Sequence, residues 1–479
     1  MAPKNQRKMN LRKAKDELSK SVSHIGKGIS AGARELNPIH PKTTMQASLL
    51  LAAVVVGIIA YFYAELITLT QGVFNKGLQS HPYLALLLGP CLFLMATWLV
   101  VKFAPEAKGS GIPQVLQAID GVENGKRGEM TGPLVSIKTA AWKIISSVVG
   151  ILGGASIGRE GPTVQVASSV FAFTARHARR YFGTLDLQSY LIAGASAGIS
   201  AAFNTPLAGI TFALEEIAEH SFAQFKRIVM LAVIVGGITA QAIGGNYLYF
   251  GHPVVKGSAL SLIPIAILLG LLGGIFGGVF SKILTHPKYR ILPSSWWGKA
   301  LVCGIICALI NVLTNGDTAG SGYEVTRRFM DNAQGTLPSL YFPEKLLTTA
   351  FSYLSGMAGG IFSPCLSIGA GLGFTTGQLF QVAGLKACAL IGMVAFFSGV
   401  VQAPLTAVII IMEMTDQSML LIPFMIGAFL AQGVGKLIMP VPLYRHLAFH
   451  VKSSEGKPGT TKPALVRLES LSRRRAGDS

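Results

Sequence analysis

"SSVVGILGGASIGREGPTVQVASSV", residues 146–170, sets two adjacent charged residues, Arg159 and Glu160, inside a glycine-rich apolar run. Glycine frees the backbone from helical geometry, and a proline in the first turn favours a new helix start. Pro162 follows Glu160 at that spacing. The stretch therefore predicts a helix that begins near Glu160 within an apolar environment, instead of one continuous helix.

Long apolar segments recur on both sides of this stretch. The chain has 479 residues, of which 51% are hydrophobic and 13% charged, about half the charged fraction of a soluble domain. Apolar runs at 45–69, 83–104 and 262–284 each reach the roughly 20 residues that a bilayer-crossing helix needs. We therefore predict an all-α polytopic membrane protein whose first run is a retained helix, not a signal peptide. Polar stretches at 285–299 and 315–344 are predicted to be connecting loops.

The net charge of +19 lies mostly near the two ends of the chain. Residues 1–44 hold ten lysines and arginines against three acids, and residues 445–479 hold eight against three. Because basic flanks stay inside during insertion, we expect the tails, 1–44 and 452–479, to be cytoplasmic. Without interleaved aromatic residues, a nucleic-acid-binding role is not expected, whereas contact with anionic lipids is.

The two halves of the chain resemble each other. "GGASIGREGP" (153–162) aligns with "SGMAGGIFSP" (355–364), and residues 194–216 align with residues 392–414. One such match could arise by chance in a glycine-rich chain, but several in the same order indicate a duplicated architecture.

Interrupted helices are predicted at three motifs, "GSGIP" (109–113), "GREGP" (158–162) and "GIFSP" (360–364). Any one break is also compatible with a simple kink. Paired breaks in two halves instead predict broken, re-entrant helices that meet at the bilayer midplane, where a transport site lies. We assign two inverted structural repeats to residues 45–250 and 251–451.

A helix that begins inside the membrane has a definite chemistry. Its first N–H groups lack partners, and its end carries about half a positive charge. Several such ends directed at one buried point would hold an anion by partial charges and hydroxyl donors, without a full positive charge. Binding of that moderate strength permits release, so the pattern favours a transported anion.

Other classes of site find little support in the sequence. An intramembrane serine protease would need Ser110 as nucleophile and a base on a neighbouring helix. The histidines lie in tails, loops and at helix ends: His24, His40, His81, His177, His220, His252, His286, His446 and His450. The cysteines are expected to be small buried side chains without metal-ligand spacing: Cys91, Cys303, Cys307, Cys365 and Cys388. We predict no enzyme, no metal and no cofactor.

The three motifs, followed by Tyr444 in "PVPLYRHLAF", stand in the order and spacing of the CLC chloride channel and transporter family, which the chain resembles over about residues 45–450. The resemblance implies that the Ser110 and Tyr444 hydroxyls bind a central chloride and that the Ile361 and Phe362 N–H groups complete the site. It implies a homodimer with a separate pathway in each subunit. The rest of the motifs would line the pathway: Gly109, Gly111, Pro113, Gly158, Arg159, Gly161, Pro162, Gly360 and Pro364.

The resemblance also assigns two carboxyl groups to proton coupling. Glu160 would block an anion site as a carboxylate and yield it to chloride when protonated. Glu216 stands where family exchangers keep a glutamate near the cytoplasmic side and channels have an uncharged residue. This favours a chloride/proton antiporter, with a passive voltage- or pH-gated chloride channel as the alternative. Glu215, which aligns with Glu413, is equally compatible with a helix-terminal position at the water interface.

Substrate and location follow from the same resemblance. Ser110 with Tyr444 points to chloride, with bromide and nitrate tolerated, because nitrate-preferring relatives carry proline at the serine position. Arg159 either has a structural role or faces an outer vestibule. Paired CBS domains, which many eukaryotic members carry, do not follow the membrane region, so we expect a prokaryote-like protein in a bacterial inner membrane.

Overall fold

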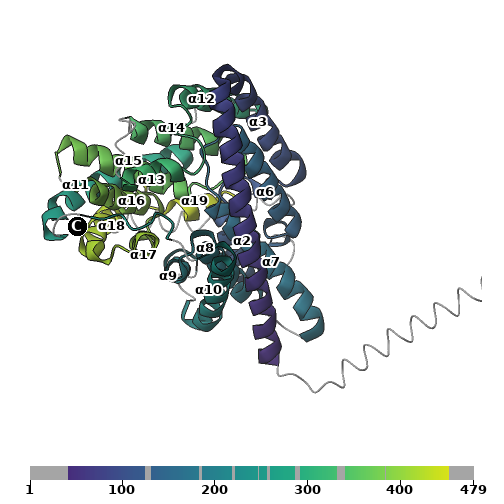
Figure 1. The fold of residues 1–479 in the computed structure, drawn as a ribbon. Coiled ribbons are helices and arrows are strands. Elements are labelled where there is room, and N and C mark those ends of the chain that lie inside the picture. Colours follow the sequence, from purple (N-terminus) through teal and green to yellow (C-terminus); the bar gives the residue numbers. More distant parts are fainter. Residues whose placement is uncertain are drawn as a thin grey trace, which may run out of the picture.

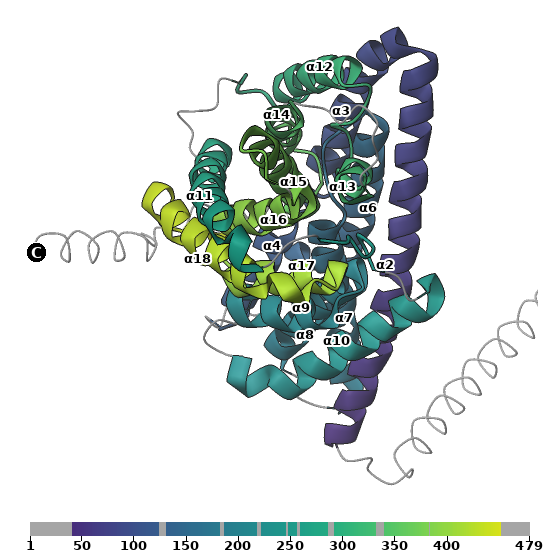
Figure 2. The same ribbon diagram turned by 60° about the vertical axis from the view of Figure 1, so that its left-hand side comes forward.

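The computed structural model describes residues 41–123, 131–182, 186–217, 222–245, 248–255, 259–285, 292–331, 340–382 and 384–451. Within these ranges every extended element is a helix, and α2 (Pro41–Ser80) runs along one side of the others (Figures 1 and 2). The predicted all-α class is confirmed. Of the predicted tails, residues 1–40 and 452–479 lie outside the described residues.

The helices fall into two consecutive sets (Figure 1). After α2 the first set comprises α3 (Pro82–Phe103), the 3₁₀ turn η1 (Pro105–Ala107), α4 (Ile112–Glu123), α5 (Thr131–Leu134), α6 (Ile137–Leu152), α7 (Glu160–Phe182), α8 (Leu187–Phe203), α9 (Pro206–Phe212), the π turn η2 (Ala213–Ile217) and α10 (Phe222–Gly244). The second comprises η3 (Ala259–Leu262), α11 (Ile263–Thr285), α12 (Trp296–Leu313), α13 (Tyr323–Asp331), α14 (Tyr341–Leu354), α15 (Phe362–Leu379), α16 (Leu385–Val401), α17 (Pro404–Thr415), η5 (Ser418–Leu420), α18 (Leu421–Ile438) and α19 (Leu443–Phe449).

The outer surface of the bundle is apolar. Seven helices of the described ranges are long and apolar enough to cross a membrane, and only 33 to 50% of each spanning window is buried. Large side chains such as Leu51, Phe62 and Leu87 therefore remain exposed. In water such a face would be an aggregation hazard, whereas acyl chains solvate it well. Length, composition and exposure together support a polytopic membrane protein.

Two stretches predicted as loops are partly helical. Helix α12 begins at Trp296, inside the predicted 285–299 loop, and α13 occupies the middle of 315–344. Ser295 explains the first start, because its hydroxyl accepts a hydrogen bond from the Gly298 N–H and caps the helix. The polar residues of 285–299 thus include Ser295, the N-cap of α12, although their composition had predicted a loop.

Reciprocal backbone contacts relate the two sets of helices. Gly158 and Gly360 exchange N–H···O bonds of 2.7 and 2.9 Å. The Gly109 N–H donates to the Met357 carbonyl at 2.9 Å, and the Gly320 N–H donates to the Ala155 carbonyl at the same distance. Positive φ angles also recur in aligned pairs: Gly109 with Gly320, Gly111 with Gly322, and Gly154 with Gly356. These are the contacts of two repeats related by a two-fold axis that passes between Gly158 and Gly360.

A second pair of exchanged contacts joins the repeats. The Glu215 carboxylate accepts hydrogen bonds from the first-turn N–H groups of α17, at Leu405 (3.1 Å) and Thr406 (2.6 Å). The Glu413 carboxylate accepts from the first turn of α9, at Leu207 (3.1 Å) and Ala208 (2.9 Å). Each acid therefore caps the N-terminus of a helix in the other repeat, where negative charge is favourable. Glu215 is not simply the end of its own helix.

The centre of the molecule is formed by α15 and α16. Nearly every residue of both helices is buried. A Cβ atom on Gly373 would collide with the Cys388 carbonyl, so the two backbones approach more closely than ordinary side chains permit. This tight pair fixes where α15 begins.

Candidate functional site

The predicted broken helices begin at one place. A Cβ built on Gly360, before α15, would lie 3.0 Å from the Gly158 carbonyl oxygen and 3.1 Å from the Gly161 nitrogen, at the start of α7. A Cβ on Gly161 would collide with the Ser110 hydroxyl, in the loop that leads into α4. The starts of α4, α7 and α15 therefore meet in the protein interior, where their first N–H groups have no helical acceptors.

Ser110 and Tyr444 are brought together at this place. Tyr444 lies on α19, and both side chains are buried. Their hydroxyl groups lie near each other, and neither forms a hydrogen bond of good geometry with any described residue. A buried hydroxyl without a partner is costly, so a pair of them at one point indicates a ligand or transported species.

The start of α15 adds backbone donors. Phe362 is its first residue and Ile361 precedes it, and both are fully buried. No side chain caps this helix start. The Phe362 ring is held against Phe397, with ring centroids 4.3 Å apart, and against Phe203 at 5.1 Å. The sequence-predicted donors at Ile361 and Phe362 thus stand at an uncapped helix N-terminus with a rigid position.

Glu160 is the first residue of α7 and is fully buried. Its carboxylate lies against Gly158, where a Cβ would collide with it, and beside Ser363 in the first turn of α15. Neither carboxylate oxygen forms a hydrogen bond within 3.5 Å to a described residue. The carboxylate is therefore close to the first N–H groups of two helices, α7 and α15, where a negative charge is favourable.

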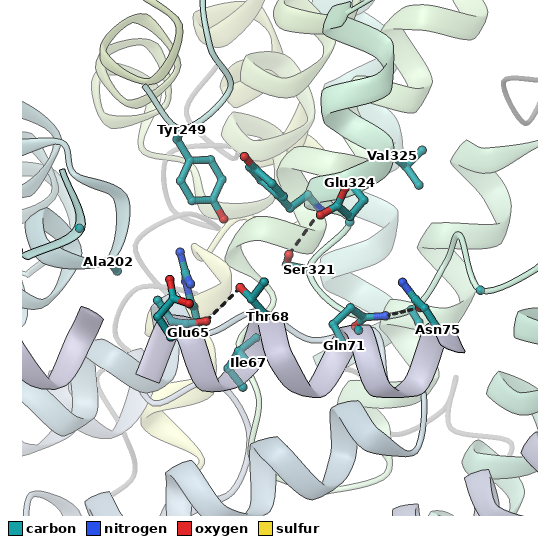
Figure 3. A pocket seen from close by; sticks show the side chains of 18 of the residues that line it. Glu65, Ile67, Thr68, Gln71, Asn75, Ala202, Tyr249, Ser321, Glu324 and Val325 are labelled. Atoms are coloured by element: carbon teal, nitrogen blue, oxygen red, sulfur yellow. Dashed lines mark hydrogen bonds between the residues drawn. The ribbon is translucent and has the colours of Figure 1, made fainter. Parts of the chain in front are cut away.

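Arg159 lies at the edge of a cavity of about 700 Å³. Its guanidinium lies 6.0 Å from the centre of the Tyr249 ring. Polar side chains of α2, of the loop before α13 and of the first turn of α13 line the same cavity (Figure 3): Glu65, Thr68, Gln71, Asn75, Ser321 and Glu324. Of the two readings for Arg159, the one in which it faces a vestibule is the one the geometry supports.

Glu216 occupies the π turn after α9 and is 4% exposed. It follows Glu215, whose carboxylate is fixed on α17, so the two neighbouring acids have separate surroundings. The Glu216 carboxyl interacts electrostatically with the Tyr444 hydroxyl. The structure therefore places Glu216 on the Tyr444 side of the site, and Arg159 on the cavity side.

Two site residues are missing from the sequence predictions. Ser363 stands beside Glu160 with a buried hydroxyl, and its signal was the serine directly before Pro364. Lys143 is fully buried on α6. Its signal was a lone lysine in the apolar run "TAAWKIISSVVG", because ionisable residues inside membrane helices usually have a role.

The alternatives receive no support from the described residues. They contain no group of three potential metal ligands. The Ser110 hydroxyl has no histidine partner among them, so a serine nucleophile would lack its base. The prediction that all five cysteines are buried is wrong for Cys91, which is exposed on α3. That face of α3 is apolar and outward, a place where a small thiol is tolerated.

Comparison with known proteins identifies relatives over most of the chain. The family model described as "Voltage gated chloride channel" matches residues 91–436. The H(+)/Cl(−) exchange transporter ClcA of Yersinia pestis bv. Antiqua (strain Angola) is 30% identical over 388 residues, which cover 75% of this chain and 76% of the relative. ClcA of Vibrio cholerae serotype O1 (strain ATCC 39541 / Classical Ogawa 395 / O395) is 28% identical over 432 residues, covering 83% and 87%. These relatives are named as transporters and not as enzymes.

Solved structures share the fold. A slow cyanobacterial Cl−/H+ antiporter superimposes with a TM-score of 0.76 at 23% identity, covering 88% of this chain and all of that one. A CLC-type fluoride/proton antiporter superimposes with a TM-score of 0.67 at 21% identity, covering 84% and 97%. The helical architecture, the family match and the bacterial relatives agree: the chain belongs to the CLC family of voltage-gated chloride channels and chloride/proton transporters.

Proposed function

We propose that this protein is a chloride/proton antiporter that moves both ions through a pathway within each subunit. The single observation that carries the proposal is the convergence of two unpartnered buried hydroxyls, on Ser110 and Tyr444, with the uncapped N-terminus of α15. The named activity of the bacterial relatives supports the same assignment.

The chemistry of these groups suits a halide. Hydroxyl and amide donors with a helix dipole attract an anion, but none carries a full charge, so the ion can leave again. Bromide and nitrate offer the same single negative charge with weaker hydration, and we expect both to be tolerated.

Glu160 would act as the gate. As a carboxylate at the start of α7 it is attracted by the same N–H groups that attract chloride, and it therefore competes for an anion position. When it binds a proton, that attraction weakens and chloride can take its place. One carboxyl then links the two fluxes, because it returns to the site only after it has released its proton.

The proton would enter and leave on opposite sides. Glu216, buried on the Tyr444 side, is suited to take a proton from the cytoplasm and pass it toward Glu160. The cavity that Arg159 lines is suited to be the outer mouth, where chloride and the Glu160 proton meet water. We propose cytoplasmic termini and a bacterial inner membrane, since both ends are basic.

We propose a homodimer with an independent pathway in each subunit. All proposed site residues come from one chain, so a partner subunit is not needed to complete the site. The exposed apolar residues Leu207 on α9 and Leu405 on α17 flank the exchanged Glu215 and Glu413 caps. We propose that this face joins two subunits, with lipid covering the others.

Flux measurements in proteoliposomes test the proposal. An imposed chloride gradient is expected to drive protons uphill through the wild-type protein. Glu160→Ala should keep chloride flux but lose proton coupling and pH dependence, and Glu216→Ala should keep chloride flux without proton movement. Glu123→Ala, at the exposed end of α4, serves as the matched control and should behave as wild type. Wild-type vesicles that dissipate chloride with no proton signal would establish the passive channel instead.

A further inference from the structure

Lys143 of α6 is a buried lysine with an unusual set of partners. Its side chain is fully buried, and its Nζ donates to the carbonyl oxygens of Ala107 and Gly109, each at 2.8 Å. Within the described ranges it forms no ion pair. A buried amino group needs hydrogen-bond acceptors, and here the backbone on both sides of Lys108 supplies them.

The loop before α4 is held by its carbonyl oxygens. The Lys108 carbonyl accepts from Gln114 Nε2 at 2.5 Å, and the Gly109 carbonyl accepts from the Gly359 N–H at 3.0 Å in addition to Lys143. In a trans peptide the C=O and the following N–H point in opposite directions. Because the Gly109 oxygen is drawn toward Lys143, the Ser110 N–H in the same peptide faces away from the lysine.

This orientation matters for an anion. A carbonyl oxygen turned toward the site would repel chloride, whereas an N–H or hydroxyl attracts it. Lys143 binds the carbonyl oxygens of Ala107 and Gly109, so these oxygens do not face the proposed chloride site. The same contacts help to hold Gly109 in its positive-φ conformation, at +67°. The next residue is Ser110, so its hydroxyl depends directly on how this loop is held.

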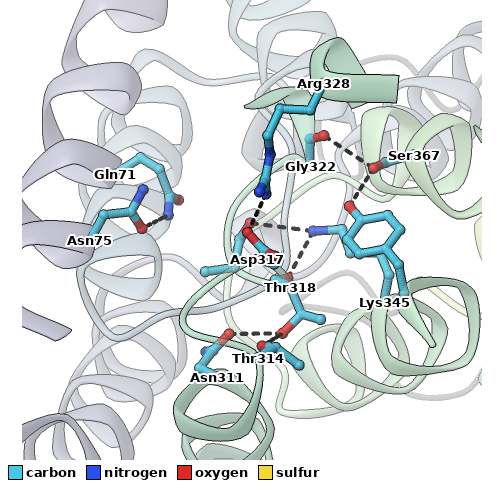
Figure 4. A network of polar contacts seen from close by, with 12 residues as sticks. Gln71, Asn75, Asn311, Thr314, Asp317, Thr318, Gly322, Arg328, Lys345 and Ser367 are labelled. Atoms are coloured by element: carbon cyan, nitrogen blue, oxygen red, sulfur yellow. Dashed lines mark hydrogen bonds and ion pairs between the residues drawn. The ribbon is translucent and has the colours of Figure 1, made fainter. Parts of the chain in front are cut away.

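The second repeat also has a buried lysine that donates to the carbonyl oxygens of a loop, but that loop leads elsewhere. Lys345 of α14, also fully buried, donates to the carbonyl oxygens of Thr318 (2.8 Å), Ala319 (3.3 Å) and Gly320 (2.8 Å), as Figure 4 shows in part. The loop that it holds leads to Ser321, which lines the cavity and not the site of Tyr444. Two lysines thus hold equivalent loops, but only one loop reaches the proposed chloride site.

We propose that Lys143 is a positioning residue for chloride binding: its amino group orients the carbonyls of Ala107 and Gly109 away from the ion and holds the Ser110 hydroxyl and N–H toward it. The inference rests on the proposed role of Ser110 as a chloride ligand. Lys143 itself contacts the backbone and not the ion.

Chloride titration calorimetry on the purified wild-type protein and on Lys143→Met tests the proposal. Methionine preserves the length of the side chain but removes the donor. We expect chloride affinity to fall about tenfold or more in Lys143→Met. Lys345→Met is the matched control, because it removes an equally buried lysine from the equivalent loop, and its chloride affinity should stay within about twofold of wild type. Thermal unfolding of both variants measures the structural cost that they share.

A double mutant separates positioning from general damage. If Lys143 acts through Ser110, Lys143→Met should cost little further affinity in a Ser110→Ala background. Where Lys143→Met does not fold, Lys143→Gln retains an N–H donor and should give an intermediate loss. Wild-type affinity in a folded Lys143 variant, or an equal loss in Lys345→Met, would overturn the inference. A wild-type protein that binds no chloride would instead overturn the proposed function.

Discussion

The two repeats share a scaffold and differ in chemistry. Each contributes one glycine to the Gly158–Gly360 pair at the two-fold axis, a buried helical lysine that holds a loop, and a glutamate that caps a helix of the other repeat. At the aligned helix starts, however, the first repeat has Glu160 and the second has Phe362.

The loops diverge in the same way. Ser110 is buried near Tyr444, whereas its counterpart Ser321 lines the cavity. Tyr444 has no equivalent in the first repeat, because it lies on α19, the last helix of the second set, which has no counterpart in the first. Duplication therefore explains why helix starts converge, and the departures from symmetry make the two sides of the convergence chemically different. A carboxyl on only one of the two central helix starts would give the proposed pathway a direction.

The largest effect is expected at the axis itself, where the two glycines are not equivalent. A Cβ on Gly360 would meet the Gly158 carbonyl and the Gly161 nitrogen, which are backbone atoms that cannot move aside. A Cβ on Gly158 would first meet the Glu160 carboxylate, which can move aside because it is the end of a flexible side chain. We expect Gly360→Ala to lose about 1–3 kcal/mol of stability, or not to fold. Gly158→Ala should fold, but it should displace the carboxylate of Glu160, the proposed gate.

Thermal unfolding and paired chloride and proton fluxes measure this difference. Gly158→Ala is expected to conduct chloride with weakened proton coupling, like a milder form of Glu160→Ala. Equal stability loss in both glycine variants, with normal coupling in Gly158→Ala, would contradict the asymmetry that the Glu160 side chain introduces.

Much of this arrangement was predictable from the sequence. Apolar run lengths predicted the spanning helices, and Gly–Pro spacing predicted the start of α7 near Glu160 and a helix break within 360–364, where α15 begins. These signals are local. The partner of Glu215 was not predictable, because its acceptor role depends on α17, a helix nearly two hundred residues away that only tertiary folding brings near. Repeat alignment set Glu215 opposite Glu413 but did not indicate that each caps the other's repeat.

Other misses have the same cause. Helix α13 lies in a polar stretch whose composition resembles a loop, and its Arg328 is held by an ion pair with Asp317 (Figure 4). Lys143 was overlooked because its acceptors are backbone carbonyls, which every sequence contains. The site hydroxyls were identified by family resemblance, and their lack of partners emerged only from packing.

An intermediate effect is expected from the exchanged caps. Glu215→Ala and Glu413→Ala each leave two first-turn N–H groups without an acceptor, and each should cost about 1–2 kcal/mol of stability. Symmetry predicts similar losses. Function should differ, because Glu215 adjoins Glu216 and Glu413 does not. Proton flux relative to chloride flux is expected to fall in Glu215→Ala and to hold in Glu413→Ala, as proteoliposome assays would measure. Equal proton-to-chloride coupling in the two variants would show that the position of Glu216 in the π turn η2 does not depend on the contact between Glu215 and α17.

The smallest effect is expected at the contact between α19, the last helix of the second repeat, and α4 of the first repeat. Arg445 of α19 pairs with Asp120 of α4 at 3.2 Å, and Gln117 Nε2 donates to the Val451 carbonyl at 2.7 Å. Both contacts tie the helix of Tyr444 to the helix that follows Ser110. Since the ion pair is partly exposed, it is worth about 0.2–1 kcal/mol, so Arg445→Gln should weaken chloride affinity by no more than about fivefold.

High ionic strength should reduce the difference between Arg445→Gln and wild type, because salt screens a partly exposed pair. The charge-swapped double mutant, Asp120→Arg with Arg445→Asp, should recover part of the affinity lost in either single mutant if attraction between α4 and α19 sets the Ser110–Tyr444 spacing. Calorimetric chloride titration of wild type, Arg445→Gln, the two charge-reversed single mutants and the double mutant at two gluconate concentrations measures both effects. If the charge swap recovers no affinity, attraction between Asp120 and Arg445 does not set the position of α19. Packing around the buried Tyr444 would then fix this helix, which has no counterpart in the first repeat.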